Sequence, residues 1–267
     1  MENRTEHNPE TQRFQIPPEL IHTLQTACQL AVLTGAGISA ESGVPTFREA
    51  QTGLWSRYDP QELATPQAFR RDPKLVWEWY TWRRNLVSQA DPNAGHHALA
   101  KMEKLVKENN SRFTLITQNV DGLHQRAGSE GVIELHGNIN RTKCFLEGIP
   151  VEENESSEDI PPRCPVCGGP LRPDVVWFGE NLSAQALKSA WDIAQTCDLF
   201  FSIGTSTVIE PAASLPHIAL NQGAIVVEIN PSDTPLTPLA TYVLRAPAGE
   251  ILPALLLSAW GKLPNSQ

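Results

Sequence analysis

The sequence predicts an α/β protein built on a parallel, doubly wound sheet. Three short apolar runs, Leu30–Leu33, Leu199–Ile203 and Ile225–Ile229, are typical of strands that are covered on both faces. Helical stretches alternate with the strand runs, as they do in strand–helix–strand crossovers. Small or polar residues follow each run directly, and open sheets of this kind bind ligands beyond the carboxyl ends of their strands.

Local signals place the elements in chain order. Pro17 and Pro18 suit the start of a helix that we expect to reach about Gln29. Asn93 is expected to cap a helix that runs to about Glu108. The remaining apolar runs are 113–117, 132–135 and 175–178. The remaining helical stretches are 73–90, 182–195 and 211–221.

Two segments interrupt the alternation of strands and helices. One is helical, at about 47–92, and the other bears cysteines, at about 140–175. Both are interpreted as excursions from one domain of residues 17–262, preceded by a disordered tail of residues 1–16. The 267 residues suffice for one large core with a smaller insertion.

Composition restricts the class of protein. Apolar residues make up 40% and charged residues 19% of the chain, as in globular proteins. No apolar run approaches the ~18 residues of a membrane span, and Met1–Gln15 lacks the features of a signal or transit peptide. We therefore expect a cytoplasmic protein without membrane contacts. The net charge of −9 argues against nucleic acid as a ligand. It weakly favours basic partners such as lysine-bearing proteins, and a monomer is expected.

The cysteine pattern predicts thiols rather than disulfides. The chain has five cysteines, an odd number that does not suit a disulfide framework in a cytosolic protein. Cys28 and Cys197 lie in apolar contexts, and we expect both to be buried and unreactive.

The residues after the strands form the expected wall of a nucleotide crevice. These strand-end clusters are Thr34-Gly35, Gln118-Asn119-Val120-Asp121, His136-Gly137, Gly204-Thr205-Ser206 and Asn230. Gly35-x-Gly37-x-x-Ala40 formally fits the dinucleotide fingerprint. Gly43 and Pro45 would end the long helix that the fingerprint requires, so an ordinary dehydrogenase is not predicted. The alternative is a turn that only packs a strand on a helix, but such a turn does not need the serines and Arg48 that follow.

Six motifs together resemble the sirtuins, the NAD-dependent protein-lysine deacylases. They occur in family order over about residues 20–258: Gly35–Arg48, Thr117–His124, Leu135–Gly137, Val176–Glu180, Gly204–Ser206 and Glu228–Asn230. The resemblance implies a Rossmann-like parallel sheet domain with a small zinc-ribbon-like module and a helical module inserted. It implies NAD as the cofactor and acylated-lysine proteins or peptides as substrates.

The resemblance also assigns roles to individual residues. For the pyrophosphate it implies Gly35, Ala36, Gly37 and Ser39, and for the adenosine end Gly204, Thr205, Ser206 and Asn230. For the nicotinamide half it implies Phe47, Arg48, Asn119 and Asp121, with further NAD contacts from Ser42, Thr46, Gln118 and Ala248. His136 would be the general base, which suits a histidine near neutral pH, with Asn119 and Asp121 as its catalytic partners. His96, His97 and His124 are interpreted as helix-terminal or packing residues.

Tyr80 and Arg83 predict which acyl group is removed. Residues three apart share a helix face, and a phenol beside a guanidinium can bind a carboxylate. Tyr-x-x-Arg resembles sirtuins of the class III type, which remove succinyl, malonyl and glutaryl groups, and Ala64 and Thr46 fit the same class. Arg84 can also face Tyr80 by spacing alone, and only the family pattern favours Arg83. The tryptophans at 77, 79 and 82 are interpreted as core residues.

The stretch around the apolar run 175–178 is expected to pair with the substrate backbone as an added strand. It comprises Val175, Val176, Trp177, Phe178, Gly179 and Glu180.

The zinc motif departs from the family pattern, which is C-x2-C, a spacer and C-x2-C. Cys164 and Cys167 form an intact pair, but upstream Cys144 is followed by Glu147 where a second cysteine belongs. Three thiolates with Glu147, another acid or water can hold zinc, and a module that folds without metal is the open alternative.

Two other functions remain open. A general lysine deacetylase or a mono-ADP-ribosyltransferase would use the same fold. A non-catalytic ADP-ribose-binding module is disfavoured, because the residues expected for catalysis are all present.

Overall fold

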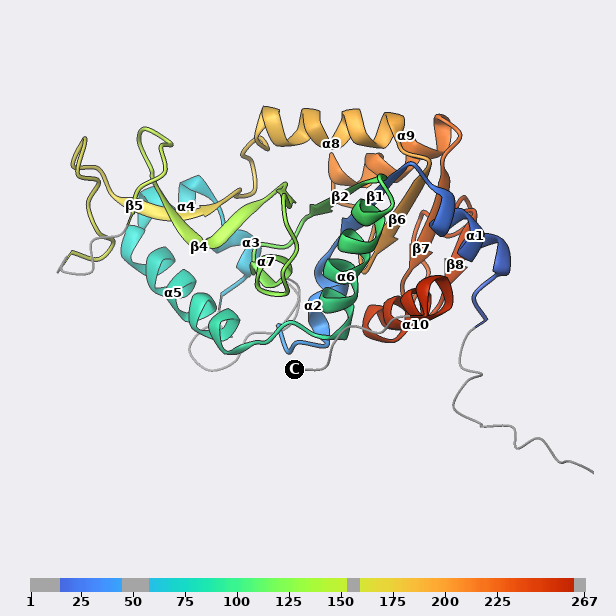
Figure 1. Cartoon of the computed structure of the whole chain (residues 1–267). Helices are drawn as coiled ribbons and strands as arrows, with labels where there is room; N and C mark the ends of the chain where they lie inside the picture. The colour runs from blue at the N-terminus through green and yellow to red at the C-terminus, as the bar shows by residue number, and fades with distance from the viewer. Residues whose placement is uncertain (1–14, 45–57, 153–158, 262–267) are drawn as a thin grey trace, which may run out of the picture.

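A six-stranded parallel sheet forms the centre of the protein (Figure 1). The computed structural model describes residues 15–44, 58–152 and 159–261. The strand order is β3-β2-β1-β6-β7-β8, so the chain builds outward from the adjacent strands β1 and β6 in both directions. This is the order of a Rossmann-type sheet, and it creates a topological switch point between β1 and β6. The predicted fold class is confirmed.

The described ranges contain these elements. The sheet strands are β1 Gln29–Thr34, β2 Arg112–Thr117, β3 Ile133–Glu134, β6 Leu199–Ile203, β7 Ile225–Ile229 and β8 Tyr242–Leu244. The antiparallel pair is β4 Gly137–Cys144 and β5 Leu171–Val175. The shorter helices are α2 Ala36–Ala40, α3 Pro60–Leu63, α4 Pro66–Arg71, α7 Leu123–Arg126, η3 Ala212–Ser214 and α9 Leu215–Asn221. The longer helices are α1 Pro18–Thr26, α5 Pro73–Gln89, α6 Ala94–Glu108, α8 Ala184–Thr196 and α10 Ala248–Trp260.

Helices cover the sheet on both faces, which explains the continuous apolar strands. Leu30 and Val32 of β1 pack into the core beneath α1, α6 and α10, while Ala31 and Leu33 pack beneath α8 and α9. Successive side chains of a strand point to opposite faces, so each face needs apolar residues of its own. Asn93 caps α6 as predicted, because its side chain accepts the backbone N–H groups of Gly95 and His96.

A second, smaller module extends from one side of the sheet (Figure 1). It combines α3, α4 and α5 with the β4–β5 pair, and Phe69, Trp79, Tyr80, Ile139 and Trp177 are buried in its core. The two segments that interrupt the sheet pattern therefore pack on each other. This core also positions α5 beside the segment that follows β5.

Several boundaries differ from the sequence-based expectations. Helix α1 ends at Thr26, because Gln29 already pairs with β2 as the first residue of β1. Of the apolar run 175–178, only Val175 belongs to a strand. Cys28 is exposed in the turn before β1, so its predicted burial is wrong, whereas Cys197 is buried and its burial raises the pKa of the thiol to about 11.

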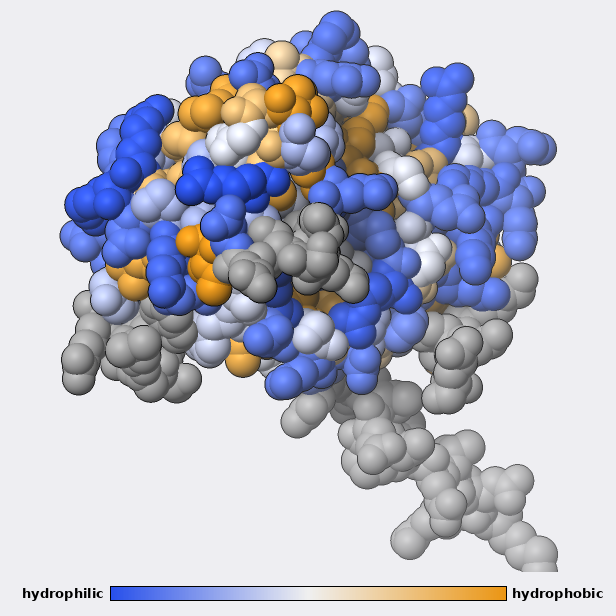
Figure 2. Space-filling view, turned by 90° about the vertical axis from the view of Figure 1, so that its left-hand side faces the viewer, coloured by the Kyte–Doolittle hydropathy of each residue, from blue (hydrophilic) through white to orange (hydrophobic). Residues whose placement is uncertain are grey.

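The side of the molecule formed by the smaller module carries apolar patches within a mainly hydrophilic surface (Figure 2). Its exposed apolar side chains include Leu146, Ile149, Ile160 and Val166. Among the described residues, the helices are too short or too polar to cross a bilayer.

Gly37→Ala should destabilise the fold at the switch point. A Cβ at residue 37 would lie 2.6 Å from the Cα of Gly204, which is backbone and has little room to move. Overpacking of this kind costs about 1–3 kcal/mol or more of unfolding free energy. Chemical denaturation measures the loss.

Gly131→Ala is the matched control for Gly37→Ala. Gly131 has a φ of +63°, and a Cβ added at this residue would meet no heavy atom within 4 Å. Only backbone strain of about 1 kcal/mol is therefore expected. Equal losses for the two variants would contradict the close-contact explanation.

Candidate active site

The loops after β1 and β6 meet in direct backbone contact at the switch point. Gly35 N–H donates to Ile203 O at 3.0 Å, and Gly37 N–H donates to Gly204 O at 2.8 Å. A side chain on Gly35, Gly37 or Gly204 would meet backbone atoms at 2.6–2.8 Å. The glycines therefore bring together the two loops for which the family resemblance implies contacts with the pyrophosphate and the adenosine.

Hydrogen bonds join further strand ends to the same edge. Gln118 Nε2 donates to Thr205 Oγ1 at 2.9 Å, and Asn230 Nδ2 donates to Thr205 O at 3.0 Å. Thr205 is buried, and Ser206 beside it is exposed. The loops after β2, β6 and β7 thus form one connected surface. Ala248 is the first residue of α10 and is buried.

Two polar residues expected at the nicotinamide half of NAD, Asn119 and Asp121, form a buried network with Ser39, which was expected at the pyrophosphate. Ser39 Oγ donates to Asp121 Oδ2 at 2.8 Å and accepts from Asn119 Nδ2 at 3.1 Å. Asn119 Nδ2 also donates to Gly35 O at 3.0 Å, so the network is tied to the glycine loop. Burial raises the pKa of the Asp121 carboxyl, while the backbone N–H of Leu123 and the Ser39 hydroxyl oppose that shift.

Two histidines that the sequence analysis gave only packing or helix-end roles support this network. His96 Nδ1 accepts the backbone N–H of Asn93, which leaves Nε2–H to donate to Ser39 Oγ at 3.5 Å. His124 Nε2 lies 2.9 Å from Thr34 Oγ1, and the two imidazole rings are 4.9 Å apart. Burial lowers the pKa of His96 to about 4, with a smaller contribution from the charge of His97, and lowers the pKa of His124 to about 3, with a smaller contribution from the charge of His96. Both rings are therefore neutral at pH 7.

The spacing of these histidines gave no signal of the network. His96 and His124 are 28 positions apart in the sequence, and only the packing of α6 on α7 brings them together. The helix-end role of His96 is present, because the residue completes the capping box of α6.

His136 lies where β3 ends and β4 begins. Its Nδ1–H donates to Gln118 O at 2.9 Å, which fixes the tautomer and leaves the lone pair on Nε2. Burial lowers the pKa of His136, and the bond to Gln118 opposes that shift only partly. The imidazole is thus a neutral base at physiological pH, held in one orientation.

The segment that follows β5 bridges the sheet edge and the smaller module. Val176 N–H donates to His136 O at 2.9 Å, and Phe178 N–H donates to Ala64 O at 2.9 Å. Glu180 closes the segment, because its carboxylate accepts the N–H of Trp177 and bonds the buried guanidinium of Arg172. The expected substrate residues 175–180 and Ala64 therefore lie together, beside His136.

Tyr80 and the two following arginines have different surroundings. Tyr80 Oη accepts Trp177 Nε1–H at 2.9 Å, and burial raises its pKa to about 12 despite the nearby charge of Arg83. The guanidinium of Arg83 lies 5.2 Å from the ring centre of Trp79. Arg84 instead joins α5 to β4, since its Nε donates to Ile139 O at 2.6 Å. Of these two arginines, Arg83 acts electrostatically on Tyr80, as Arg172 of β5 also does.

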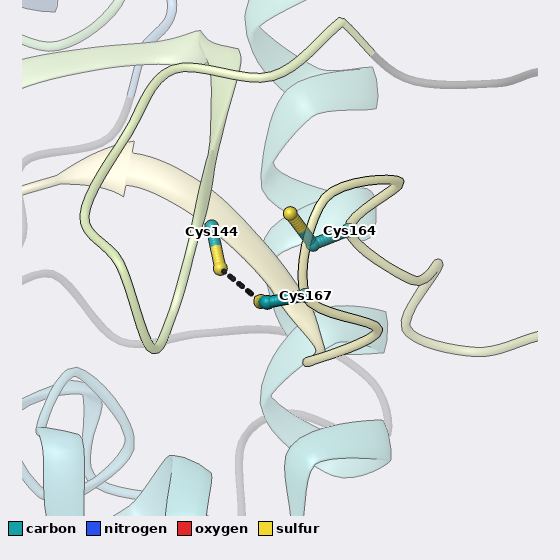
Figure 3. Close-up of side chains that lie close together, drawn as sticks. All are labelled: Cys144, Cys164 and Cys167. Carbon is teal, nitrogen blue, oxygen red and sulfur yellow. Dashed lines mark hydrogen bonds between the residues drawn. The ribbon is translucent and has the colours of Figure 1, made fainter.

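The three cysteines of the zinc motif gather at one point of the smaller module (Figure 3). The Sγ atoms of Cys144, Cys164 and Cys167 all lie within 4.8 Å of one another, and those of Cys144 and Cys167 are 3.4 Å apart. Thiolates on a tetrahedral Zn²⁺ lie about 3.8 Å apart, given Zn–S bonds of about 2.3 Å. The cluster therefore fits zinc.

The remaining site predictions fall partly outside the described ranges. Thr46, Phe47 and Arg48 are not among the described residues. Ser42 is half-buried, and its Oγ accepts Asn93 Nδ2–H at 3.0 Å, so it contacts the start of α6. His97 is exposed.

A Rossmann-type sheet whose switch point carries glycine loops, with a fixed neutral histidine beside them, defines a nucleotide-dependent enzyme, and the smaller module adds a cysteine cluster that fits zinc. Residues 35–211 match the Sir2 family, and the chain belongs to that family. A protein of Methylococcus capsulatus named NAD-dependent protein deacylase is 49% identical over 251 residues, covering 91% of this chain and 97% of the relative. NAD-dependent protein deacylase 1 of Pseudomonas aeruginosa is 48% identical, with coverages of 90% and 98%.

Solved structures are similar as well. A crystal structure of a Sir2 homologue–NAD complex has a TM-score of 0.83 at 46% identity and covers 92% of this chain and 94% of its own. A Sir2–p53 peptide–NAD+ complex has a TM-score of 0.78 at 33% identity, with coverages of 91% and 98%. The resemblance read from the sequence motifs is confirmed at the level of the family.

The buried histidines predict a stability that falls with acid. Because the folded-state pKa values of His96 and His124 lie below 6.5, the unfolded chain binds more protons as pH decreases from 6.5 to 5. Each histidine should then cost about 1.4 kcal/mol of unfolding free energy per pH unit. Urea denaturation across this pH range measures the slope. His22→Gln, at an exposed position in α1, should leave the slope unchanged, and a pH-independent stability would contradict the burial of neutral rings.

Proposed function

We propose that this protein is an NAD-dependent protein-lysine deacylase that yields nicotinamide, free lysine and O-acyl-ADP-ribose. The observation that carries the proposal is His136, a neutral base with a fixed tautomer, beside the connected loops of the switch point. The relatives named NAD-dependent protein deacylases and the Sir2 homologue bound to NAD support it.

The residues at the sheet edge fit a dinucleotide. Gly35 and Gly37 offer a pyrophosphate approach without side chains, and Thr205 and Asn230 stand at the adenosine end. Asn119 and Asp121, held by Ser39, would contact the nicotinamide and its ribose. NAD, when bound, supplies a leaving nicotinamide and the sugar that receives the acyl group. His136 accepts a proton at Nε2 during that transfer.

The substrate enters between the two modules in this proposal. The segment 175–180 pairs with the peptide backbone as an added strand. Its own conformation is fixed by the Arg172–Glu180 ion pair and by the bonds to His136 and Ala64. Because the segment binds the backbone of the peptide, it does not select for the peptide's amino-acid sequence. The acylated lysine is therefore the feature of the substrate that the enzyme recognises.

We further propose that acidic acyl groups (succinyl, malonyl and glutaryl) are preferred and that acetyl is removed weakly. Tyr80 Oη already accepts Trp177 Nε1–H, so its own hydrogen is directed to another acceptor. The raised pKa keeps that hydrogen in place at neutral pH. A carboxylate would accept from this hydroxyl and pair with the cationic Arg83.

A general deacetylase or a mono-ADP-ribosyltransferase is the second candidate, and the shared Sir2 family favours it equally. The proposal also assumes one catalytic domain of residues 17–262, acting as a cytoplasmic monomer. Nicotinamide release after mixing the protein with NAD and succinyl-lysine peptide tests the main proposal. Absence of release with every acyl peptide tried would favour a binding module instead.

His136→Asn should abolish deacylation while NAD binding persists, because only the proton acceptor is removed. For the wild type, kcat/KM should begin to decrease with acid only below pH 6.5, since burial lowers the pKa of His136. Steady-state rates from pH 5 to 8 provide the measurement. An acid limb centred above pH 7 would argue against His136 as the base.

Arg83→Met should lower desuccinylation far more than deacetylation. Loss of one partner of a charged pair in a partly desolvated site costs about 2–5 kcal/mol, which corresponds to at least about a thirty-fold decrease in kcat/KM. Tyr80→Phe, which keeps the ring and removes the hydroxyl, should shift the preference in the same direction. Matched succinyl- and acetyl-lysine peptides measure both rates, and equal losses on the two substrates would refute the acyl assignment.

A further inference from the structure

The cysteine module contains two hairpins that repeat the same backbone pattern 20 residues apart. The first runs from Lys143 to Pro150 and the second from Arg163 to Pro170, and in each hairpin the first and last residues form a β-bridge. Each hairpin carries one half of the zinc motif. The shared pattern allows each residue of one hairpin to be matched with a residue of the other.

Hydrogen bonds fix the match position by position. Cys144 N–H donates to Ile149 O at 2.9 Å, as Cys164 N–H donates to Gly169 O at 2.7 Å. The carbonyl of each of these cysteines also accepts a hydrogen bond. Gly148 N–H donates to Cys144 O at 3.0 Å, and Gly168 N–H donates to Cys164 O at 2.9 Å. The two glycines have φ values of +67° and +71°, a left-handed conformation that closes both turns.

The side chains follow the same correspondence. Cys144 and Cys164 are buried, and each thiol accepts a backbone N–H from three residues later, from Glu147 and from Cys167. Leu146 and Val166 are both exposed at the tips of the hairpins. Glu147 and Cys167 are likewise both exposed. Glu147 therefore occupies the position that corresponds to a zinc-facing cysteine, and its place in the fold is intact although the residue type is changed.

A glutamate can serve at this position. Carboxylate oxygens bind Zn²⁺ at about 2.0–2.2 Å, alongside thiolates at about 2.3 Å. The carboxylate of Glu147 is not among the clustered ligand atoms in this structure, but the residue is exposed and its side chain has additional rotatable bonds, so that it can turn toward the three thiols. One carboxylate with three thiolates also carries the same total charge as four thiolates, so the charge balance of the module is kept.

We propose that Glu147 is the fourth protein ligand of a three-cysteine, one-carboxylate zinc site with Cys144, Cys164 and Cys167. The oxygen ligand is harder than a thiolate, and zinc prefers the softer donor. The site consequently holds zinc less tightly than a four-cysteine site on the same two hairpins. The proposal concerns the metal alone and does not depend on the catalytic function.

Zinc affinity of the purified full chain tests the proposal. Competition with a chromophoric chelator should show at least about ten-fold weaker zinc binding for Glu147→Gln and Glu147→Ala, because even supporting residues of metal sites contribute about 10–100-fold. Glu147→Cys should bind zinc more tightly than the wild type. Glu152→Gln, an exposed acid just beyond the first hairpin, is the control and should behave as the wild type.

Cobalt(II) substitution supplies a second, independent measurement. Absorption by the Co²⁺-loaded wild type should show tetrahedral coordination with three thiolates, and Glu147→Cys should add the charge-transfer intensity of a fourth. Unchanged zinc affinity in both Glu147→Gln and Glu147→Ala would overturn the proposal, as would a Glu147→Cys spectrum without added thiolate intensity. Circular dichroism confirms that the exposed substitutions leave the fold intact.

Discussion

The active edge of this protein depends on the backbone contact between the loops after β1 and β6. Gly37 and Gly204 approach so closely that a single added carbon on either would meet main-chain atoms. This contact joins the two halves of the sheet at the point where the strand order reverses. The polar residues at the other strand ends are hydrogen-bonded to the same loops, so the position of each depends on this approach.

A second constraint is the burial of polar groups beneath the edge. Ser39 connects Asn119, Asp121 and His96, and every link is a hydrogen bond within the protein. Buried polar networks of this kind are rigid when all members are satisfied. Burial also keeps His96, His124 and His136 neutral. The expected proton acceptor, His136, and the two histidines beneath the sheet edge are therefore uncharged for the same reason.

Much of the sheet could be predicted from the sequence, because strands covered on both faces leave continuous apolar runs. The polar residues at the strand ends could be predicted from the positions of these runs. The residues expected to bind the cofactor could be predicted once the motifs were matched to a family. Helix α10 was not predicted, since it is apolar on most sides and contains Pro253. β8 has three residues and lies at the sheet edge, which is too short for a periodicity. The network roles of His96 and His124 and the tie between Arg84 and β4 arise from tertiary packing alone.

The most direct test of this proposed site is a crystal structure of the protein grown with NAD. We predict a dinucleotide that lies across the tips of β1 and β6, with its pyrophosphate against Gly35–Gly37 and its nicotinamide ribose beside Nε2 of His136. A dinucleotide bound at another edge of the sheet, or with its nicotinamide half away from His136, would contradict the proposed site.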